Sequence, residues 1–446
     1  MALINKLIFF LVYFGYGLIL PILGENHLAP PHYKVVNISS LLPKPYCQKS
    51  TSGPAIGSQK LKIVSRHGPC FPNAKTPSSD SEQLMNWDEV RVRSINKKPK
   101  KTPSFLSNYD YGGYTVKIGL GTPRQNFFLM FDTGSPATWV RCKSCTKGCK
   151  SNNHLYDPLV SSTHTNNKSG CNGSFSVSYR DHSSVKGIWG CDTLTGDDRD
   201  IGQIQNFRFV CGQNLKGDFD EMDGILGLGK GDSSVTSQIP SMQMFSYFIP
   251  ITSSRMGNLY FGNEAMDRSK DCSITQFTAL VDGQCKDCYY VDLIGISVAG
   301  NKLDVSSRML ASGETIIDSG TVITQLPEEV YSALRDAFRQ SMLGYTLLEK
   351  ADTLLEKADN LDTCYRVKKP FIIPEIKFHF GKENSIDVSL SESGTLWTPT
   401  ESIMCLAFAS AKDNLSIIGS VQQRGMNVIY DLKQKRIGFG TNCPTY

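Results

Sequence analysis

The sequence lacks a second long apolar run, and this absence limits how the chain could meet a membrane. Its 446 residues are 40% hydrophobic, yet only Leu7–Leu23 is almost wholly apolar over a length close to that of a bilayer span. This run follows Lys6 and ends near Gly24, which is typical of a secretory signal peptide. We therefore expect a signal peptide at residues 1–24, with a signal anchor as the alternative, and no membrane span elsewhere.

Histidine is scarce, and the cysteines lack the regular spacing of a metal site. The chain has 7 His and 14 Cys. Cys142-x2-Cys145 and Cys285-x2-Cys288 could hold zinc, but neither has a regular second pair or a nearby His. Cysteines of a secreted chain favour disulfides instead. We expect disulfides, no metal and no other cofactor.

Charge is unevenly distributed along the chain. The net charge is +5, but residues 25–107 carry 13 Lys/Arg and 5 Asp/Glu, a net of +8. With Lys6 counted separately, residues 108–446 are left with −4. A basic stretch could bind nucleic acid, but in a secretory chain it favours a propeptide that covers an acidic cleft. We expect residues 25–107 to be this propeptide, acting as an intramolecular inhibitor, and no nucleic-acid partner.

The expected propeptide is rich in Pro, Ser and Lys and shows little periodicity. Only Gln83–Ile95 has a helical pattern, and the basic stretch Lys97–Lys101 is suited to cleavage. From Tyr109 onward, short strands alternate with Gly, Asn, Asp and Ser turns, which predicts a mainly β body. The clearest helix is predicted over Glu328–Gly344, with Pro327 at its start.

Two short motifs, Phe131–Ser135 and Ile317–Thr321, organise this body. Both read hydrophobic, Asp, Thr or Ser, Gly, then Ser or Thr, and each follows an apolar run typical of a buried strand. Asp and Gly are turn formers, so a pair of strand-end turns is the alternative interpretation.

The two motifs predict catalysis by Asp132 and Asp318. Two carboxylates a few ångströms apart cannot both ionise, so they share one proton. The ionised partner can act as general base on a water held between them. The protonated partner can donate to a carbonyl oxygen and stabilise the developing oxyanion.

The neighbouring residues are expected to support this pair. Glycine allows the backbone to turn tightly beneath each carboxylate. The hydroxyls of Ser135 and Thr321 can orient the carboxylates, and Thr133 and Ser319 can cross-link the two loops. The expected supporting residues are Thr133, Gly134, Ser135, Ser319, Gly320 and Thr321.

A second pair of similar segments follows the two motifs, and we call this repetition the sequence echo. Gly224–Gly229 follows the first Asp at about the same interval as Ser416–Ser420 follows the second. The echo predicts an all-β, bilobal fold: two homologous β lobes with the active-site cleft between them and few short helices. We place the N-terminal lobe at residues 108–282 and the C-terminal lobe at residues 283–446.

Several segments resemble pepsin-like aspartic peptidases, specifically the plant nepenthesin-like and chloroplast-nucleoid-protein-like branch. Leu61–Cys70 is similar to the propeptide signature of that branch. The other matching segments are Gly119–Pro123, Phe131–Val140, Leu226–Gly229, Tyr290–Val298, Ile316–Thr324, Leu361–Tyr365, Cys405–Phe408 and Ile418–Arg424. The resemblance covers residues 61–443. It implies a bilobal β fold, Asp132 and Asp318 as catalytic residues, and endopeptidase activity on polypeptides at acidic pH.

The resemblance also implies a β-hairpin flap over the cleft. Its tyrosine falls at Tyr179, and Trp139 matches the tryptophan that hydrogen-bonds this tyrosine. The following residue, Arg180, replaces the usual Gly. The family motifs around Cys364 and Cys405 imply a disulfide between them.

Other cysteines depart from the family pattern. Phe248 stands where the branch usually has Cys, so we expect Cys443 or another cysteine to lack its usual partner. Four cysteines are unusual for the branch and are candidates for replacement bridges: Cys191, Cys272, Cys285 and Cys288.

Two functions remain open at this stage. The first is a monomeric aspartic endopeptidase of the secretory pathway, in the extracellular space or apoplast, with the vacuole as the alternative. The second is a catalytically weak or silent binding protein of the same fold, such as an inhibitor of microbial glycosidases. The candidate N-glycosylation sites, each an N-x-S sequon that fits this compartment, are Asn37, Asn167, Asn172 and Asn414.

Overall fold

The computed structural model describes most of the chain from residue 29 onward. The described residues are 29–48, 60–66, 68–72, 113–149, 154–178, 184–196, 201–217, 219, 222–305, 310, 315–348, 361–368, 370–381, 385–411 and 414–444. Within these ranges, no helix is long and apolar enough to cross a membrane. The predicted signal peptide, the predicted helix Gln83–Ile95 and the basic stretch Lys97–Lys101 lie outside them.

Strands dominate the structure, and helices are few and short. The strands up to residue 302 are β1 (Tyr33–Val36), β2 (Lys60–Ser65), β3 (Tyr114–Leu120), β4 (Gln125–Asp132), β5 (Trp139–Arg141), β6 (Ser174–Ser178), β7 (Ser184–Gly196), β8 (Gln203–Lys216), β9 (Gly224–Gly227), β10 (Met244–Phe248), β11 (Gly257–Phe261), β12 (Ile274–Val281), β13 (Tyr290–Val291), β14 (Leu293–Val298) and β15 (Asn301–Lys302). The later strands are β16 (Thr315–Ile317), β17 (Thr324–Pro327), β18 (Thr346–Leu347), β19 (Cys364–Arg366), β20 (Phe371–Pro374), β21 (Ile376–Phe380), β22 (Ile386–Ser389), β23 (Leu396–Thr400), β24 (Ile403–Leu406), β25 (Phe408–Ala411), β26 (Ser416–Ile418), β27 (Asn427–Asp431) and β28 (Arg436–Thr441). The α-helices are α2 (Ile38–Leu41), α4 (Val235–Gln238), α5 (Asn263–Asp267), α7 (Glu328–Ser341) and α8 (Glu392–Thr395), and the 3₁₀ helices are η1 (Pro158–Val160), η3 (Pro240–Met242) and η4 (Arg268–Asp271).

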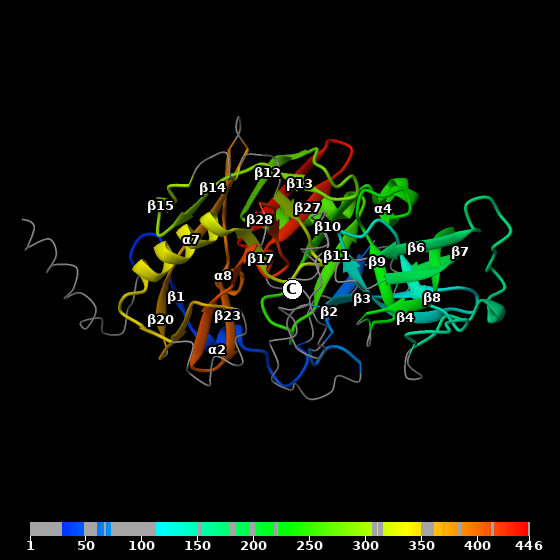
Figure 1. Ribbon diagram of the computed structural model, residues 1–446, viewed down its shortest axis with the longest axis horizontal. Coiled ribbons are helices and arrows are strands. Elements are labelled where there is room, and N and C mark those ends of the chain that lie inside the picture. The colour runs from blue at the N-terminus through cyan, green and yellow to red at the C-terminus, as the bar shows by residue number, and fades with distance from the viewer. Residues whose placement is uncertain are drawn as a thin grey trace, which may run out of the picture.

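A central antiparallel sheet joins the two lobes that the sequence predicts. Its strands pair in the order β3, β2, β11, β10, β27, β28 and β12. Figure 1 shows β4 and β6–β9 on one side of these strands, and α7, β14, β20 and β23 on the other. The main hydrophobic core runs without a break through both lobes and the central sheet.

The two lobes share one strand arrangement around the predicted catalytic motifs. In the N-terminal lobe, β4 pairs in parallel with β9, β5 pairs in parallel with β8, and β5 is antiparallel to β9. In the C-terminal lobe, β16 pairs in parallel with β26, β17 pairs in parallel with β25, and β17 is antiparallel to β26. The sequence echo therefore corresponds to a repeated unit in which β9, or β26 in the other lobe, lies between the two strands that flank the aspartate loop.

Helix α7 (Glu328–Ser341) begins where the sequence predicts and ends three residues early. Glu328 and Glu329 lie in its first turn, where negative charge is favourable. Val330, Leu334 and Phe338 are buried along one stripe. Tight turns follow from Met342 onward, so residues 342–344 are not helical.

All fourteen cysteines are paired. The disulfides are Cys47–Cys70, Cys142–Cys211, Cys145–Cys149, Cys171–Cys191, Cys272–Cys443, Cys285–Cys288 and Cys364–Cys405. Cys443, which was expected to lack its usual partner, is bridged to Cys272. The antiparallel pairing of β12 with β28 brings Cys272 beside it, since Ile274 lies opposite Thr441. The four unusual cysteines do form replacement bridges, and the sulfurs considered for zinc are all oxidised.

The segment predicted as a propeptide contains two strands that the sequence analysis missed. β1 pairs with β20 of the C-terminal lobe, and β2 lies between β3 and β11 in the central sheet. The described part of this segment is therefore held by strand pairing and apolar burial, whereas the sequence analysis predicted contact through charge. Strands of four and six residues are too short to give a clear period in a Pro-, Ser- and Lys-rich context.

Candidate active site

The first motif forms a tight loop that fixes the carboxylate of Asp132. Asp132 is the last residue of β4 and lies opposite Gly227 of β9. The backbone N–H of Gly134 donates to Oδ1 at 2.8 Å, and the Ser135 hydroxyl donates to Oδ2 at 2.5 Å. Asp132 is completely buried. Both carboxylate oxygens are therefore held by donors from the same loop.

The second motif repeats this geometry around Asp318, which directly follows β16. The Gly320 N–H donates to Oδ1 at 3.0 Å, and the Thr321 hydroxyl donates to Oδ2 at 2.7 Å. The Asp318 N–H donates to Ile418 O at 3.0 Å, which ties the loop to β26. Asp318 is also completely buried, so the two loops present equivalent carboxylates.

Reciprocal hydrogen bonds join the two loops, as the sequence predicts for Thr133 and Ser319. The Thr133 N–H donates to Ser319 Oγ at 3.1 Å, and the Ser319 N–H donates to Thr133 Oγ1 at 2.9 Å. Each of these residues directly follows its aspartate. The cross-link therefore brings Asp132 and Asp318 together from opposite lobes.

Two glycines allow a strand to cross closely behind each loop. A Cβ on Gly227 would lie 2.5 Å from Ala137 O, and a Cβ on Gly419 would lie 2.6 Å from Val322 O. Real Cβ atoms essentially never come so close to a backbone oxygen. Only glycine therefore fits at these two equivalent positions.

The sequence analysis missed two buried threonines that hold these glycines. The Thr138 hydroxyl accepts from the Gly227 N–H at 3.2 Å, and the Thr324 hydroxyl accepts from the Gly419 N–H at 3.1 Å. Both hydroxyls are fully buried. Each threonine stands six residues after its aspartate in the sequence, and this shared offset is the signal that could have identified the pair.

A cluster of buried tyrosines lies close to the second loop. Burial raises the pKa of Tyr247 well above its usual value, and the neighbouring Tyr430 and the charge of Asp318 add to the effect. The Tyr247 hydroxyl donates to Gln423 Oε1, and Gln423 Nε2 donates to Ile418 O at 3.0 Å. These tyrosines stay neutral at the pH of any assay below, and through Gln423 they link β10 to the end of β26, the strand beside the Asp318 loop.

The predicted flap is described up to its tip. β6 and β7 form an antiparallel hairpin, but Tyr179 and Arg180 lie outside the described residues. Trp139 is fully buried in β5, and its ring packs edge-on against Phe219 at 5.2 Å between centroids. Its predicted partnership with Tyr179 therefore stays a prediction.

The predicted glycosylation sites are all solvent-exposed. Their exposed asparagines are Asn37, Asn167, Asn172 and Asn414. Asn37 also caps α2, because its side-chain oxygen accepts from the Ser39 N–H at 3.2 Å.

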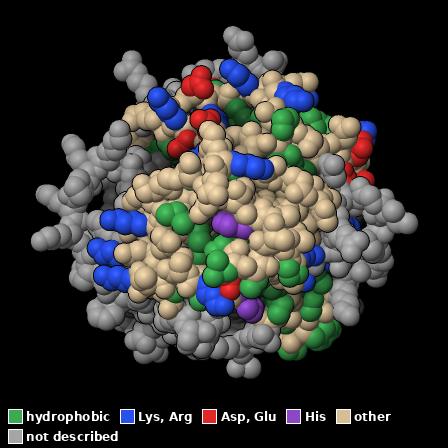
Figure 2. Space-filling model, turned by 90° about the vertical axis from the view of Figure 1, so that its right-hand side faces the viewer, with side chains coloured by type: hydrophobic (Ala, Val, Ile, Leu, Met, Phe, Trp, Pro, Cys, Tyr) green, Lys and Arg blue, Asp and Glu red, His purple; other side chains and the backbone are tan. Residues whose placement is uncertain are grey.

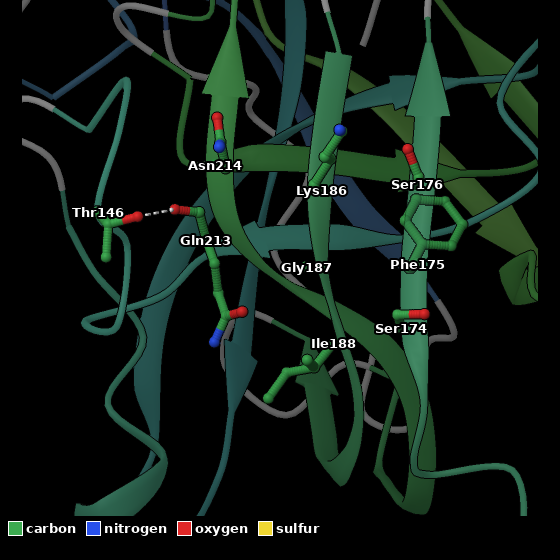
Figure 3. A pocket seen from close by; sticks show the side chains of 9 residues that line it. All are labelled: Thr146, Ser174, Phe175, Ser176, Lys186, Gly187, Ile188, Gln213 and Asn214. Atoms are coloured by element: carbon green, nitrogen blue, oxygen red, sulfur yellow. Dashed lines mark hydrogen bonds between the residues drawn. The ribbon is translucent and has the colours of Figure 1, made fainter.

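A shallow hollow lies where β6, β7 and β8 run side by side, away from both aspartate loops in the sequence. Figure 3 shows Phe175, Lys186, Ile188 and Gln213 among its lining residues, with the Thr146 hydroxyl donating to Gln213 O at 3.4 Å. Its lining contains one ionisable side chain and no acid–base pair. The end of the molecule in Figure 2 carries scattered charges of both signs. Neither feature offers catalytic chemistry to match the two aspartates.

Known proteins resemble this chain in sequence. A sequence model of the family described as eukaryotic aspartyl protease matches residues 113–442. An aspartyl protease family protein of Arabidopsis thaliana is 31% identical over 91% of this chain and 92% of its own length. Aspartic proteinase nepenthesin-2 of Nepenthes gracilis is 28% identical over 81% of this chain and 85% of its own length.

Solved structures show the same architecture at greater distance. Basic 7S globulin from soybean superimposes with a TM-score of 0.58 at 18% identity, covering 74% of this chain and 93% of the globulin. This likeness concerns the fold alone, whereas the family match and the plant relatives span most of the sequence. The chain belongs to the eukaryotic aspartyl protease family, together with plant aspartyl proteases and nepenthesin.

Proposed function

We propose that the protein is an aspartic endopeptidase that hydrolyses polypeptides at acidic pH. The observation that carries the proposal is the pair of cross-linked loops, which bring two buried carboxylates together and hold both oxygens of each. The catalytic residues are Asp132 and Asp318.

The mechanism uses one shared proton. Two carboxylates brought together in one buried site cannot both carry a charge, so one is ionised and the other protonated. The ionised carboxylate removes a proton from a water, whose oxygen then forms a bond to the carbonyl carbon of the peptide. The protonated carboxylate donates to the carbonyl oxygen and stabilises the tetrahedral intermediate. Breaking the C–N bond then requires that a proton pass to the leaving amine nitrogen.

The loop donors keep this pair ready to react. Ser135 and Thr321 each hold one carboxylate oxygen, and the neighbouring N–H groups hold the other. Groups that are already oriented need no reorganisation when the water attacks. The flap hairpin β6–β7 would close over substrate and exclude bulk water.

We further propose that the protein acts outside the cell or in the vacuole. Seven disulfides require an oxidising compartment, which the secretory pathway supplies. The exposed sequons are then N-glycosylation sites. The extracellular space is our first choice, with the vacuole as the alternative.

Cleavage of acid-denatured globin tests the proposed activity. The wild-type protein, incubated near pH 4, should produce peptides and should be blocked by a statine inhibitor that mimics the tetrahedral intermediate. Asp132→Asn and Asp318→Asn should each lower kcat by at least about a hundredfold with an unchanged circular dichroism spectrum, because each removes the shared proton. Asp192→Asn, a buried carboxylate in β7 far from both motifs in the sequence, is the control and should leave kcat unchanged. An inert wild-type protein that folds normally would favour the binding-protein alternative.

A further inference from the structure

Strand β2 is an internal strand of the central sheet, although it precedes the long stretch 73–112 in the sequence. Ile63 lies opposite Val116 of β3 on one side and Gly257 of β11 on the other. Both edges of β2 are therefore paired. Removing it would expose unpaired backbone groups on β3 and β11 together, which is costly in a buried sheet.

The side chains of β2 are built into the main core. Leu61 and Ile63 are almost completely buried, whereas Lys62 between them faces solvent. A Cβ on Gly196 of β7 would lie only 3.0 Å from the Leu61 side chain. The rest of the protein is therefore shaped around this strand, and its departure would open an apolar slot.

The chain on either side of β2 is also anchored. The disulfide Cys47–Cys70 closes a loop that contains β2. Near this disulfide, the Gln48 N–H donates to Ser254 O at 2.8 Å. A Cβ on Gly68 would lie 2.0 Å from Ser253 O, so the chain passes directly against the 253–254 turn.

A second anchor reaches the C-terminal lobe. β1 pairs along its whole length with β20, and the Lys34 ammonium donates to Leu390 O at 2.6 Å. Val36 and Ile38 are almost fully buried and belong to the main core. In Figure 1, β1 lies beside β20, and β2 lies in the centre beside β3 and β11. Residues 29–48, 60–66 and 68–72, here called the N-terminal brace, thus contact both lobes.

We propose that the N-terminal brace stays bound to the catalytic body after the chain is cut between residues 73 and 112. The slot between β3 and β11 is a binding surface whose occupant is residues 60–65 of the same chain. The cut protein is then a non-covalent complex of two polypeptides. This differs from the sequence expectation, in which residues 25–107 contact the body through charge, as a basic propeptide over an acidic cleft.

The anchoring contacts explain why acid should not release the brace. The brace makes two ion pairs that acid can weaken, His32 with Glu375 at 3.6 Å and Lys34 with Glu392 at 4.0 Å. The strand hydrogen bonds and the apolar burial described above contain no titrating group. No disulfide crosses the cut, because Cys47 pairs with Cys70 and the six other bridges join residues 142–443. Retention of the brace would therefore report the non-covalent contacts alone.

An engineered cut tests the proposal without using catalytic activity. Residues 88–94 are replaced by the recognition sequence of a site-specific protease, in an Asp318→Asn background that prevents self-cleavage. The full chain is purified, cut, and passed through gel filtration at pH 7 and at pH 4. We expect both fragments to co-elute at the volume of the uncut chain at both pH values, and to separate only in denaturant. Release of the N-terminal fragment under native conditions at either pH overturns the proposal.

A matched pair of variants on β2 tests whether its buried side chains hold the N-terminal fragment. Ile63→Asp should release the fragment after the cut, whereas Lys62→Asp, one position along the same strand, should retain it. Should Ile63→Asp fail to fold, hydrogen exchange of the cut protein with native β2 gives the answer. The β2 amides should stay as protected as in the uncut chain, and loss of their protection on cutting would contradict the proposal.

Discussion

At the scale of single residues, the hydroxyl of Ser319 makes two contacts across the lobes. It accepts from the Thr133 N–H at 3.1 Å and donates to Phe131 O at 3.3 Å. Ser319→Ala would leave a buried N–H without a partner, which costs about 1–3 kcal/mol of stability. The dyad would also lose one of its two cross-links, so kcat should fall more than KM changes. Thermal unfolding and globin cleavage measure the two effects.

Ser420 provides a matched control for this change. Its hydroxyl is buried close to the second loop, where its N–H donates to Thr321 O at 2.7 Å, but the hydroxyl itself has no hydrogen-bond partner among the described residues. Ser420→Ala therefore removes a buried polar group without breaking a bond and should leave kcat unchanged and the melting temperature equal or higher. Equal losses in Ser319→Ala and Ser420→Ala would contradict a specific role for the cross-link.

Asp362 is a residue whose charge stabilises the fold above a defined pH. Burial opposes its ionisation, but hydrogen bonds from Tyr331 and Thr363, together with Arg339 and Arg335, hold its pKa below the ordinary 3.8. Since the folded-state pKa is depressed, the stabilisation is complete above the unfolded pKa and is lost as pH falls through the folded one.

Replacing Asp362 should destabilise the protein at neutral pH and have less effect in acid. Asp362→Asn should lower the free energy of unfolding by about 2 kcal/mol at pH 7, as expected for hydrogen bonds to a charged group. The difference in the free energy of unfolding between wild type and Asp362→Asn should shrink as pH falls below 3.8. Asp336→Asn is the control, because its pair with Arg335 is largely exposed and should contribute little. Urea unfolding from pH 7 to pH 2.5 measures both, and a gap that widens in acid would refute the assignment.

At the scale of elements, Gly419 allows the chain directly after β26 to pass closely behind the segment that leads from Asp318 to β17. A Cβ there would meet Val322 O at 2.6 Å and Ile323 C at 2.8 Å, both backbone atoms that cannot rotate away. We expect Gly419→Ala to destabilise the protein by about 3 kcal/mol or more, in the range of severe overpacking. Gly113→Ala is the control, since its Cβ would meet Arg66 at an ordinary 3.5 Å. A melting temperature that falls equally in both would contradict the close crossing.

Elements also show where sequence reasoning works and where it stops. Helix α7 was predictable because its 14 residues repeat one apolar stripe over several turns. The aspartate loops were predictable because each carries a chemical pattern in five consecutive residues. β2 was not, because Ile63 and Val64 are both buried and break the alternation expected of a half-buried strand. The Thr138 and Thr324 contacts needed a comparison of offsets between the two motifs.

At the scale of the whole molecule, the two lobes follow from the sequence echo, but the sheet that joins them does not. β10 pairs with β27, and Phe245 lies opposite Tyr430, far away in the chain. Phe245 and Tyr430 stack with 4.4 Å between ring centroids, a contact that no local pattern reports. Long-range register is decided by packing of the whole fold, so the central sheet and the place of β2 within it required the structure.

The disulfide Cys272–Cys443 closes the largest loop in the molecule and fastens the edge of the central sheet. It spans 171 residues, whereas Cys285–Cys288 spans 3. In the chain-entropy description, the first constrains the unfolded chain by about 5 kcal/mol and the second by about 1.5 kcal/mol. Replacing both residues of each pair by Ser should therefore lower the urea midpoint much more for Cys272 and Cys443 than for Cys285 and Cys288. An equal fall in the urea midpoint for the two double variants would contradict stabilisation by Cys272–Cys443 through the unfolded chain.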